Sequence, residues 1–446
     1  MEDLTHGSIV RHLMKTTGFM LVTMVFQTLY FLVDLYWVGR LGKEALAGVG
    51  IAGNLMFIVL AVSQMLAVGT TTFVSHAVGR KDRDNAELVF NQSLVLSGLI
   101  GALFLLTALA SRQAYVNALS ADAVTAARAL EYLAWFVPAM SLQFWMVTMG
   151  AALRGTGNFK PGMVVQTATV VINILLAPAL MFGWIGGRPL GVAGTAMASL
   201  VAVVIGTIWL ATYFIPATSY LKFKRALATP QVGLWWRVLR IGLPAGAEFA
   251  LVAAYLFIVY TVSRPFGAAA QAGFGIGLRI VQAGFMPVVA LGFAVAPVAG
   301  QNFGARKADR VRHTFRHAAL MAGGIMAVFT VVCNLVPAAM IQFFSSDPQV
   351  IAVGSEYLRI VSWTFVASGI IYVNASIFQA MGNTIPPLIA SFTRLVLVAV
   401  PAFAVSQLPG FNLRWIWYLS VGAALAQLTM NLLLLRREFR LRLSFA

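Results

Sequence analysis

Long apolar stretches fill most of the sequence and are separated by short segments that carry most of the charge. A helix needs about 20 mostly apolar residues to cross the hydrocarbon core of a bilayer. Only 10% of the residues are charged and 60% are hydrophobic, so the charges are too few to cover the surface of a water-soluble protein. The sequence therefore predicts an all-α polytopic membrane protein with twelve transmembrane helices. We expect them at about 15–38, 45–75, 88–110, 127–153, 161–184, 190–215, 241–263, 270–300, 314–338, 350–380, 386–406 and 413–435.

Lysine and arginine are distributed unevenly between the two sets of connecting segments. Most of the 31 basic residues lie in segments on the same side as the N-terminus, among them 80–83, 222–225, 305–312 and 436–442. Cytoplasmic loops of membrane proteins carry an excess of Lys and Arg, so both termini are expected in the cytoplasm. The net charge of +17 is thus explained by membrane topology and not by binding to nucleic acid.

The second half of the chain repeats the first half at a constant offset of 225 residues. LGKEALAGVGI (41–51) aligns with FGAAAQAGFGI (266–276), and Pro161 aligns with Pro386. Six helices per repeat is an even number, so both repeats enter the membrane from the same side and are parallel. Two such lobes can alternate access to a central cleft. The expected boundaries are 1–216 for the N-lobe, 217–240 for a basic interfacial linker and 241–446 for the C-lobe.

One carboxylate, Asp34, interrupts the first apolar stretch. Thr23, Gln27, Tyr30 and Asp34 follow the spacing i, i+4, i+7, i+11 and therefore share one face of a helix. A carboxylate in hydrocarbon is costly unless it is paired, protonated or in contact with water, so this face is expected to point to the protein interior. Asp34 is then either a hydrogen-bonded packing residue or a carboxylate that takes up and releases a proton.

Nine motifs in a fixed order make the chain resemble the MATE family of multidrug and toxin extrusion antiporters, and its DinF-like bacterial branch in particular. They include VDLYWVGRLGKEALAGVGI, ALRGTGNFKP and VINILLAPALMFG in the first half, and IGLPAGAE, GFGIGLRIVQ and QAMGNTIPP in the second. The resemblance covers nearly the whole chain. It implies a monomeric, cation-coupled exporter of small amphipathic molecules in the bacterial inner membrane.

The resemblance also implies a group of residues around Asp34. The family's acid on the first helix matches Asp34, its Asn on the fifth matches Asn173, and its Thr on the sixth matches Thr195. The family's N-x-x-x-D-P reads N-I-L-L-A-P here, so Ala177 stands where a second carboxylate is expected. One carboxylate suits a proton better than sodium, which needs more oxygen ligands, so we expect proton coupling. The candidate cation-coupling residues are Asp34, Asn173, Thr195, Tyr30 and Gln27.

The second half offers three further candidates, Glu248, Arg279 and Arg394, within its apolar stretches. Glu248 is expected either to take part in transport or to pair with Arg240 or Arg237 at the cytoplasmic mouth, and Arg279 is a further partner for it. If Arg279 and Arg394 both faced the cleft, the C-lobe would be positive and would accept an anionic or zwitterionic substrate.

Other classes of function lack support in the sequence. It contains no HExxH or GxSxG motif, and its single cysteine and five histidines have no metal-ligand spacing, so we expect neither an enzyme nor a bound metal or cofactor. A channel would need a selectivity filter or a ring of like charges. The alternative that stays open is a flippase or exporter of anionic or lipid-linked substrates in the same superfamily.

Overall fold

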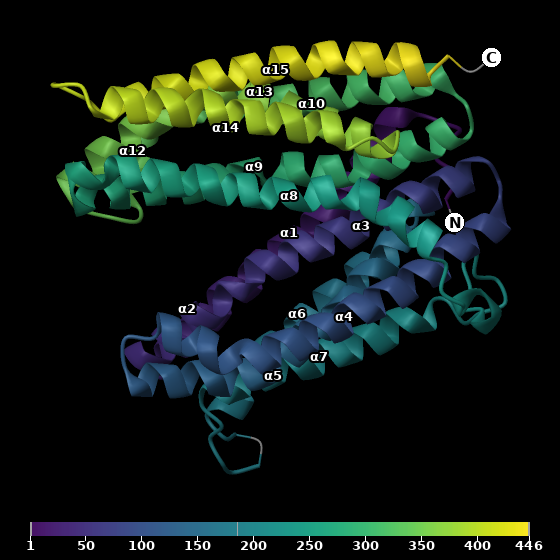
Figure 1. Cartoon of the computed structure of the whole chain (residues 1–446), viewed down its shortest axis with the longest axis horizontal. Coiled ribbons are helices and arrows are strands. Elements are labelled where there is room, and N and C mark those ends of the chain that lie inside the picture. The colour runs from purple at the N-terminus through teal and green to yellow at the C-terminus, as the bar shows by residue number, and fades with distance from the viewer. Residues whose placement is uncertain (1, 185, 445–446) are drawn as a thin grey trace. The chain divides into compact units, whose positions relative to one another are not determined.

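The computed structural model describes residues 2–184 and 186–444, and within these ranges the chain forms only helices and connecting loops (Figure 1). Twelve helical spans are long and apolar enough to cross a membrane, which confirms the predicted all-α, twelve-helix architecture. The helices are α1 (Ile9–Gly39), α2 (Lys43–Gly53), α3 (Leu55–Gly79), α4 (Arg83–Leu119), α5 (Ala123–Gly155), α6 (Lys160–Met181), α7 (Val192–Thr212), η1 (Arg225–Ala228), α8 (Val232–Ser263), η2 (Arg264–Phe266), α9 (Ala268–Gly304), α10 (Ala308–Leu335), α11 (Pro337–Gln342), α12 (Pro348–Val361), η3 (Ser362–Thr364), α13 (Phe365–Ala380), α14 (Ile385–Ser406) and α15 (Arg414–Arg442).

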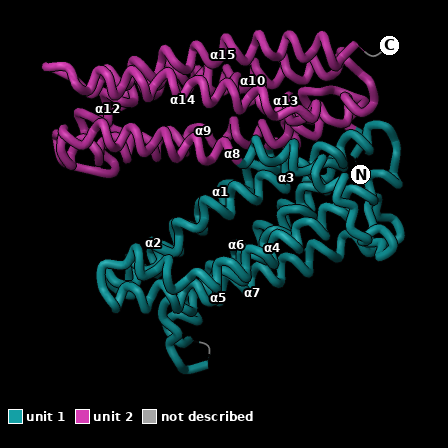
Figure 2. The backbone as a smooth tube through the Cα atoms, in the orientation of Figure 1, with its two compact units in different colours: residues 1–3, 18–246 teal, residues 4–17, 247–446 magenta. Residues whose placement is uncertain are grey.

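The chain divides into two compact units, which Figure 2 shows in different colours. Unit 1 contains Gly18–Gly246 and the residues up to Asp3, and unit 2 contains Leu4–Thr17 and the chain from Ala247 onwards. This division differs from the expected boundaries of 1–216, 217–240 and 241–446. The linker and the residues after it up to Gly246 belong to unit 1, and the first part of α1 belongs to unit 2.

Contacts at the start of α1 and α8 explain this division. A Cβ atom at Gly242, in the first part of α8, would lie 2.0 Å from the carbonyl oxygen of Met65, so α8 begins in close contact with α3 of unit 1. Just before α1, the backbone N–H of Leu4 donates to Oε1 of Gln301 at 2.9 Å. The guanidinium of Arg310 donates to the carbonyl of Gly7 at 3.0 Å. The first helix of each repeat therefore begins on the unit that contains most of the other repeat.

The sequence repeat reappears in the backbone. Asp122 accepts a hydrogen bond from the N–H of Thr125 at the start of α5, and Asp347, 225 residues later, accepts one from the N–H of Gln349 at the start of α12. Both carboxylates are therefore helix caps, which satisfy N–H groups that have no partner within the helix. The same offset relates three pairs of residues with positive φ: Gly42 and Gly267, Lys81 and Arg306, and Gly157 and Gly382.

Each unit is organised around a central span. In unit 1, α5 packs against α2, α3, α4 and α7, and in unit 2, α9 packs against α10, α12 and α13. The helices approach closely at equivalent glycines: a Cβ atom would lie 2.9 Å from the backbone N of Ala129 at Gly48, and 2.8 Å from the carbonyl of Val350 at Gly273. Small residues at such crossings are expected, because helices in a bilayer associate mainly through close packing.

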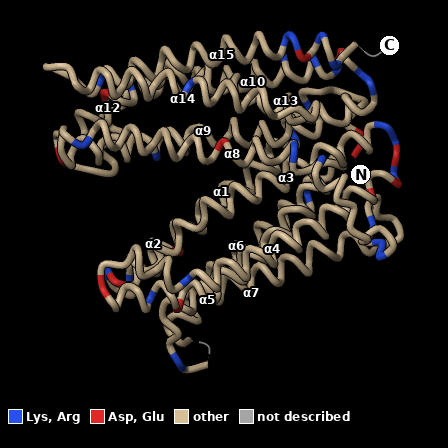
Figure 3. The backbone as a smooth tube through the Cα atoms, in the orientation of Figure 1, with Lys and Arg blue, Asp and Glu red and all other residues tan. Residues whose placement is uncertain are grey.

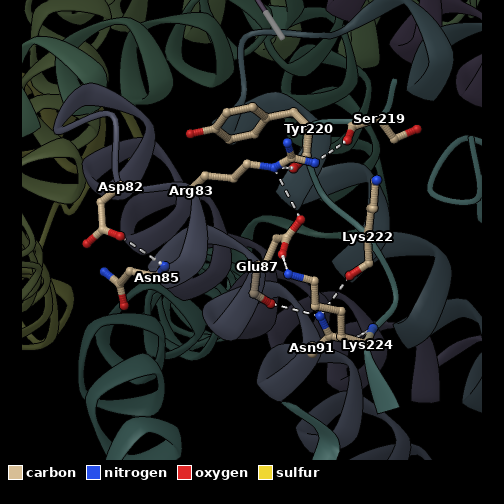
Figure 4. Close-up of polar contacts among 9 residues, drawn as sticks. All are labelled: Asp82, Arg83, Asn85, Glu87, Asn91, Ser219, Tyr220, Lys222 and Lys224. Carbon is tan, nitrogen blue, oxygen red and sulfur yellow. Dashed lines mark hydrogen bonds and ion pairs between the residues drawn. The ribbon is translucent and has the colours of Figure 1, made fainter. Parts of the chain in front are cut away.

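The segment between α7 and α8 is held on the first turns of α4, as Figure 4 shows. The guanidinium of Arg83 donates to the carbonyls of Ser219 at 2.8 Å and Tyr220 at 2.9 Å. The amide of Asn91 donates to the carbonyl of Lys222 at 2.9 Å and accepts from the N–H of Lys224 at 3.0 Å. These side chains replace the backbone partners that an irregular segment lacks.

Glu87 provides the buried negative charge of this attachment. Its side chain is only 1% exposed and forms ion pairs with Arg83, at 3.3 Å, and with Lys224. One turn further along α4, the amide of Gln92 donates to the carbonyls of Leu227 and Thr229. Figure 3 shows basic residues gathered along this segment, so Glu87 neutralises part of a positive surface.

Substitution of Gly273 by alanine tests the close packing of α9 on α12. A methyl group there would lie 2.8 Å from the carbonyl of Val350 and 3.0 Å from the N of Gly354, and backbone atoms cannot rotate away. Overpacking of this kind costs about 1–3 kcal/mol, so Gly273→Ala should lower the Tm of the protein in nanodiscs by several degrees. Gly324→Ala is the matched control, since nothing lies within 4 Å of that position, and its Tm should not fall. Equal Tm values for the two variants would contradict this account.

Substitution of Glu87 by alanine tests the attachment of the linker to α4. Glu87→Ala leaves Arg83 and Lys224 without their shared carboxylate, so the segment 217–231 should open more often. Trypsin should then cleave at Lys222, Lys224 or Arg225 about tenfold faster than in the unmodified protein. The control is Glu131→Ala, which removes an exposed ion pair with Arg128 that is worth at most about 1 kcal/mol. The interpretation fails if both variants are cleaved at the rate of the unmodified protein.

Candidate functional site

Asp34 lies near the end of α1 and faces α5 within unit 1. Its Oδ1 atom is buried and has no hydrogen-bond partner among the described residues. Its charge interacts with the phenol of Tyr30, one turn earlier on α1, and with that of Tyr132 on α5, which is 5% exposed. The carboxylate therefore lies against the interior of unit 1 with part of its hydrogen-bonding capacity unused.

A chain of polar side chains joins α1 to α6 and α7. The hydroxyl of Tyr30 lies 3.2 Å from Oγ of Ser199, and the amide of Asn173 donates to the same Oγ at 2.8 Å. Ser199 in turn donates to the carbonyl of Thr195 at 3.2 Å. A serine hydroxyl carries one hydrogen, so with that hydrogen on Thr195, Tyr30 is the donor to Ser199.

The predicted stripe on α1 is only partly buried. Tyr30 and Asp34 face the interior of unit 1, whereas Gln27 is exposed and makes no hydrogen bond to any described residue, so the structure does not bring it into the cluster. No direct hydrogen bond joins Asp34 to Asn173 or Thr195, and the hydroxyl of Thr195 donates to its own helix at Val192. Tyr30 reaches α7 because its side chain is longer, whereas Asp34 stays beside α5.

Two members of the cluster, Ser199 and Tyr132, were missed by the sequence reasoning. Ser199 lies four residues after Thr195 and so shares its helix face, which is a signal that the sequence does contain. The only signal for Tyr132 in the sequence is that a tyrosine, Tyr357, occupies the equivalent position in the second repeat. No pattern in the sequence places Tyr132 beside Asp34.

The cluster contains more unsatisfied acceptors than donors. Besides Oδ1 of Asp34, Oδ1 of Asn173 is buried without a partner in the described part of the chain. Ala177, one turn after Asn173, is 1% exposed and offers no side-chain oxygen. Buried acceptors without donors are costly, so the arrangement favours a bound proton or a small cation.

The acid and one arginine proposed for the second half are not paired. Glu248 is half-buried on α8, and its charge interacts with the phenol of Tyr372. Arg279 is exposed on α9. Within unit 2, Glu248 forms no ion pair with Arg279 among the described residues, so Arg279 is not its partner there. The sequence gives the depth of each residue along its helix but not the direction in which a long side chain turns.

Unit 2 contains a counterpart of the Tyr30 contact. The hydroxyl of Tyr255, 225 residues after Tyr30, lies 3.1 Å from Oγ of Ser420 on α15. Val259 occupies the position that corresponds to Asp34. Arg394 lies half-buried on α14, and its guanidinium donates to Oε1 of Gln427 at 3.3 Å. The two repeats thus share a framework but carry different charged groups.

Twelve apolar spans, an internal repeat and a polar cluster inside one compact unit together define a multi-pass membrane transporter. The MatE family model matches the chain twice, over residues 20–179 and 244–404. The chain belongs to the MatE family. The two matches are related by nearly the offset of the sequence repeat, so each half is one copy of the family's unit.

Characterised relatives match over most of their length. The chain is 24% identical over 412 residues to a probable multidrug resistance protein NorM of Thermotoga maritima, covering 92% of this chain and 88% of that protein. It is 26% identical over 410 residues to a probable multidrug resistance protein YoeA of Bacillus subtilis, with 89% and 87% covered. A solved multidrug resistance MATE transporter in an outward-facing conformation has the same fold, with a TM-score of 0.91 at 23% identity and 100% and 98% of the chains covered.

Proposed function

We propose that the protein is a proton-coupled antiporter that exports small amphipathic molecules by alternating access. The relatives named as multidrug resistance proteins support the export of drug-like molecules. The observation that carries proton coupling is the single carboxylate of the cluster, Asp34, whose buried Oδ1 lacks a donor. A desolvated carboxylate without a counter-charge favours its protonated form, and water entering the site favours its ionised form.

Protonation of Asp34 changes the hydrogen-bonding balance of the cluster. The ionised carboxyl group only accepts, whereas the protonated group gains one O–H donor among acceptors that lack one. Asp34 and Tyr30 lie on α1, whose first part, residues 9–17, belongs to unit 2. A change of protonation therefore acts on a helix that both units share, and this is how we expect proton binding to affect access to the transport pathway.

We place both termini in the cytoplasm and the chain in a bacterial inner membrane. The basic segments that support this orientation include the linker around Lys222 and Lys224 and the end of α15 with Arg436 and Arg437. The substrate is a small molecule, and we expect the transporter to act as a monomer. Export of anionic or lipid-linked molecules is the second candidate, and the unpaired charge of Arg394 favours it.

Substitution of Asp34 by asparagine tests whether this carboxylate couples proton binding to transport. Asp34→Asn keeps the size of the side chain but cannot bind and release a proton, so coupled efflux of a cationic dye from proteoliposomes should fall to the background rate. The Tm should stay close to that of the unmodified protein, because the carboxylate makes no hydrogen bond that the amide would lose through Oδ1. Asp309→Asn is the control, since this acid is exposed outside the membrane and pairs with Arg312. Normal coupled efflux by Asp34→Asn would show that the acid has a structural role.

The identity of the driving ion needs a separate measurement. With only one carboxylate, and with Ala177 in place of a second, the cluster offers few of the oxygen ligands that sodium requires. Dye transport into inside-out vesicles should therefore follow an imposed proton gradient in the absence of sodium. A sodium gradient, with the proton gradient collapsed by an ionophore, should drive little or no transport. Undiminished transport in the second condition would mean that sodium is the coupling ion.

A further inference from the structure

Arg394 is a half-buried cation that forms no ion pair with any described residue. Its guanidinium donates to Oε1 of Gln427 at 3.3 Å, and the amide of Gln427 donates to Oγ of Ser391 at 3.1 Å. In the described part of the chain no carboxylate pairs with Arg394. Four of the five acidic residues of unit 2 are engaged elsewhere: Asp309 with Arg312, Glu356 with Arg414, Glu438 with Arg442, and Asp347 at the start of α12. The fifth, Glu248 on α8, forms no ion pair with Arg394 among the described residues.

The depth of Arg394 prevents its charge from reaching water along the helix. Arg394 lies nine residues after Ile385 and twelve before Ser406, the ends of α14. At about 1.5 Å per residue, these ends are roughly 13 and 18 Å away. An arginine side chain is shorter than either distance. An arginine at such a depth must find an anion, backbone carbonyls or water.

The surroundings of Arg394 offer hydrogen-bond donors and hydroxyl groups. Its charge interacts with the phenols of Tyr255 and Tyr357. The indole of Trp417 packs against the ring of Tyr357 at 4.8 Å, and its Nε1–H is buried without a partner among the described residues. The cluster around Asp34 in unit 1 contains unpaired acceptors, whereas the cluster around Arg394 in unit 2 contains a cation and an unpaired donor among the described residues. The polarity of the two clusters is therefore opposite.

The repeat indicates that the fold does not need this cation. Tyr30 contacts Ser199 and Tyr255 contacts Ser420, which aligns α7 with α15. In this alignment Gly206 corresponds to Gln427, and Arg394 corresponds to Thr169. A Cβ atom at Gly206 would lie 2.3 Å from Cγ2 of Thr169, so the same pair of positions is filled by small, uncharged groups in unit 1. The same helix pair is thus built without a charge in the other repeat.

An apolar groove lies along α14 and α15, and its lining begins at residues close in sequence to Arg394 and Gln427. It is lined by Leu397 and Val405 of α14 and by Trp415, Tyr418, Ala423 and Ala426 of α15, among others. Leu397 lies three residues after Arg394 and Ala426 directly precedes Gln427, so the groove continues from the polar cluster. A molecule bound there would combine a negative head with an apolar body.

We propose that Arg394, Gln427 and Ser391 bind the anionic head of an amphipathic molecule whose apolar part lies in the α14–α15 groove. The head is a carboxylate, a sulfonate or a phosphate ester, since a guanidinium forms paired hydrogen bonds with all three. The site lies entirely within unit 2 and is independent of Asp34. A test of this anion site therefore gives a result that does not depend on whether Asp34 couples protons to transport.

Binding of two matched probes to the full-length protein in phosphatidylcholine nanodiscs tests this proposal. Octanesulfonate and octyltrimethylammonium share an apolar chain and carry opposite charges. Arg394→Gln should raise the Kd for octanesulfonate at least about tenfold and leave the Kd for octyltrimethylammonium unchanged. Arg394→Lys, which keeps the charge, should retain part of the binding. The control Arg264→Gln removes an exposed arginine of the same unit and should bind octanesulfonate normally.

A measurement on the unmodified protein keeps the proposal testable even where a variant folds poorly. Octanesulfonate should slow hydrogen exchange in peptides from α14 and α15. Phosphatidylglycerol in the nanodisc separates two sources of the anion: competition with octanesulfonate assigns the site to a lipid phosphate, and no competition assigns it to a free amphipathic anion. The proposal is overturned if Arg394→Gln binds octanesulfonate as tightly as the unmodified protein, or if protection appears only outside α14 and α15.

Discussion

A polar group inside a bilayer must find its partner within the protein, because the hydrocarbon offers none. Hydroxyl groups in the spans meet this constraint locally: Thr23, Thr261 and Thr393 each donate to a carbonyl four residues earlier. Charged groups cannot be satisfied in this way and need a site. Asp34 lies in the second half of α1 and Arg394 near the middle of α14, and around each of them the neighbouring helices supply polar side chains. The two candidate sites exist because these two charged side chains lie in spans whose other residues are mostly apolar.

Duplication followed by divergence explains why the sites differ in charge. A tyrosine from the first helix of each repeat contacts a serine of the last helix, Tyr30 with Ser199 and Tyr255 with Ser420. This shared contact fixes a common geometry, and single substitutions then set the chemistry. Asp34 against Val259 gives unit 1 an acid, and Arg394 against Thr169 gives unit 2 a base. A transporter with one proton site and one anion site needs no new fold to obtain both.

The sequence predicted features that follow from composition along a helix, and missed those that depend on neighbours. Twelve spans, the offset of 225 residues and the inward position of Asp34 could all be predicted, because apolar length and a charge within an apolar stretch are local properties. Gln27 shows the limit: periodicity put it on the polar face of α1, yet its side chain is exposed and takes no part in the hydrogen bonds of the cluster. Ser199 was missed because a serine on an apolar helix usually bonds to its own backbone, and only the arrival of Tyr30 makes it part of a cluster.

The exchange of first helices between the units places a mechanical demand on α1 and α8. Each is one continuous helix whose two parts pack in different units, with the change at Gly18 in α1 and after Gly246 in α8. Both positions coincide with residues that weaken a helix. Glycine costs about 0.5–1 kcal/mol relative to alanine inside a helix, and Pro244, just before the change in α8, removes one backbone hydrogen bond. Bending at these points therefore costs less than bending elsewhere in the same helices.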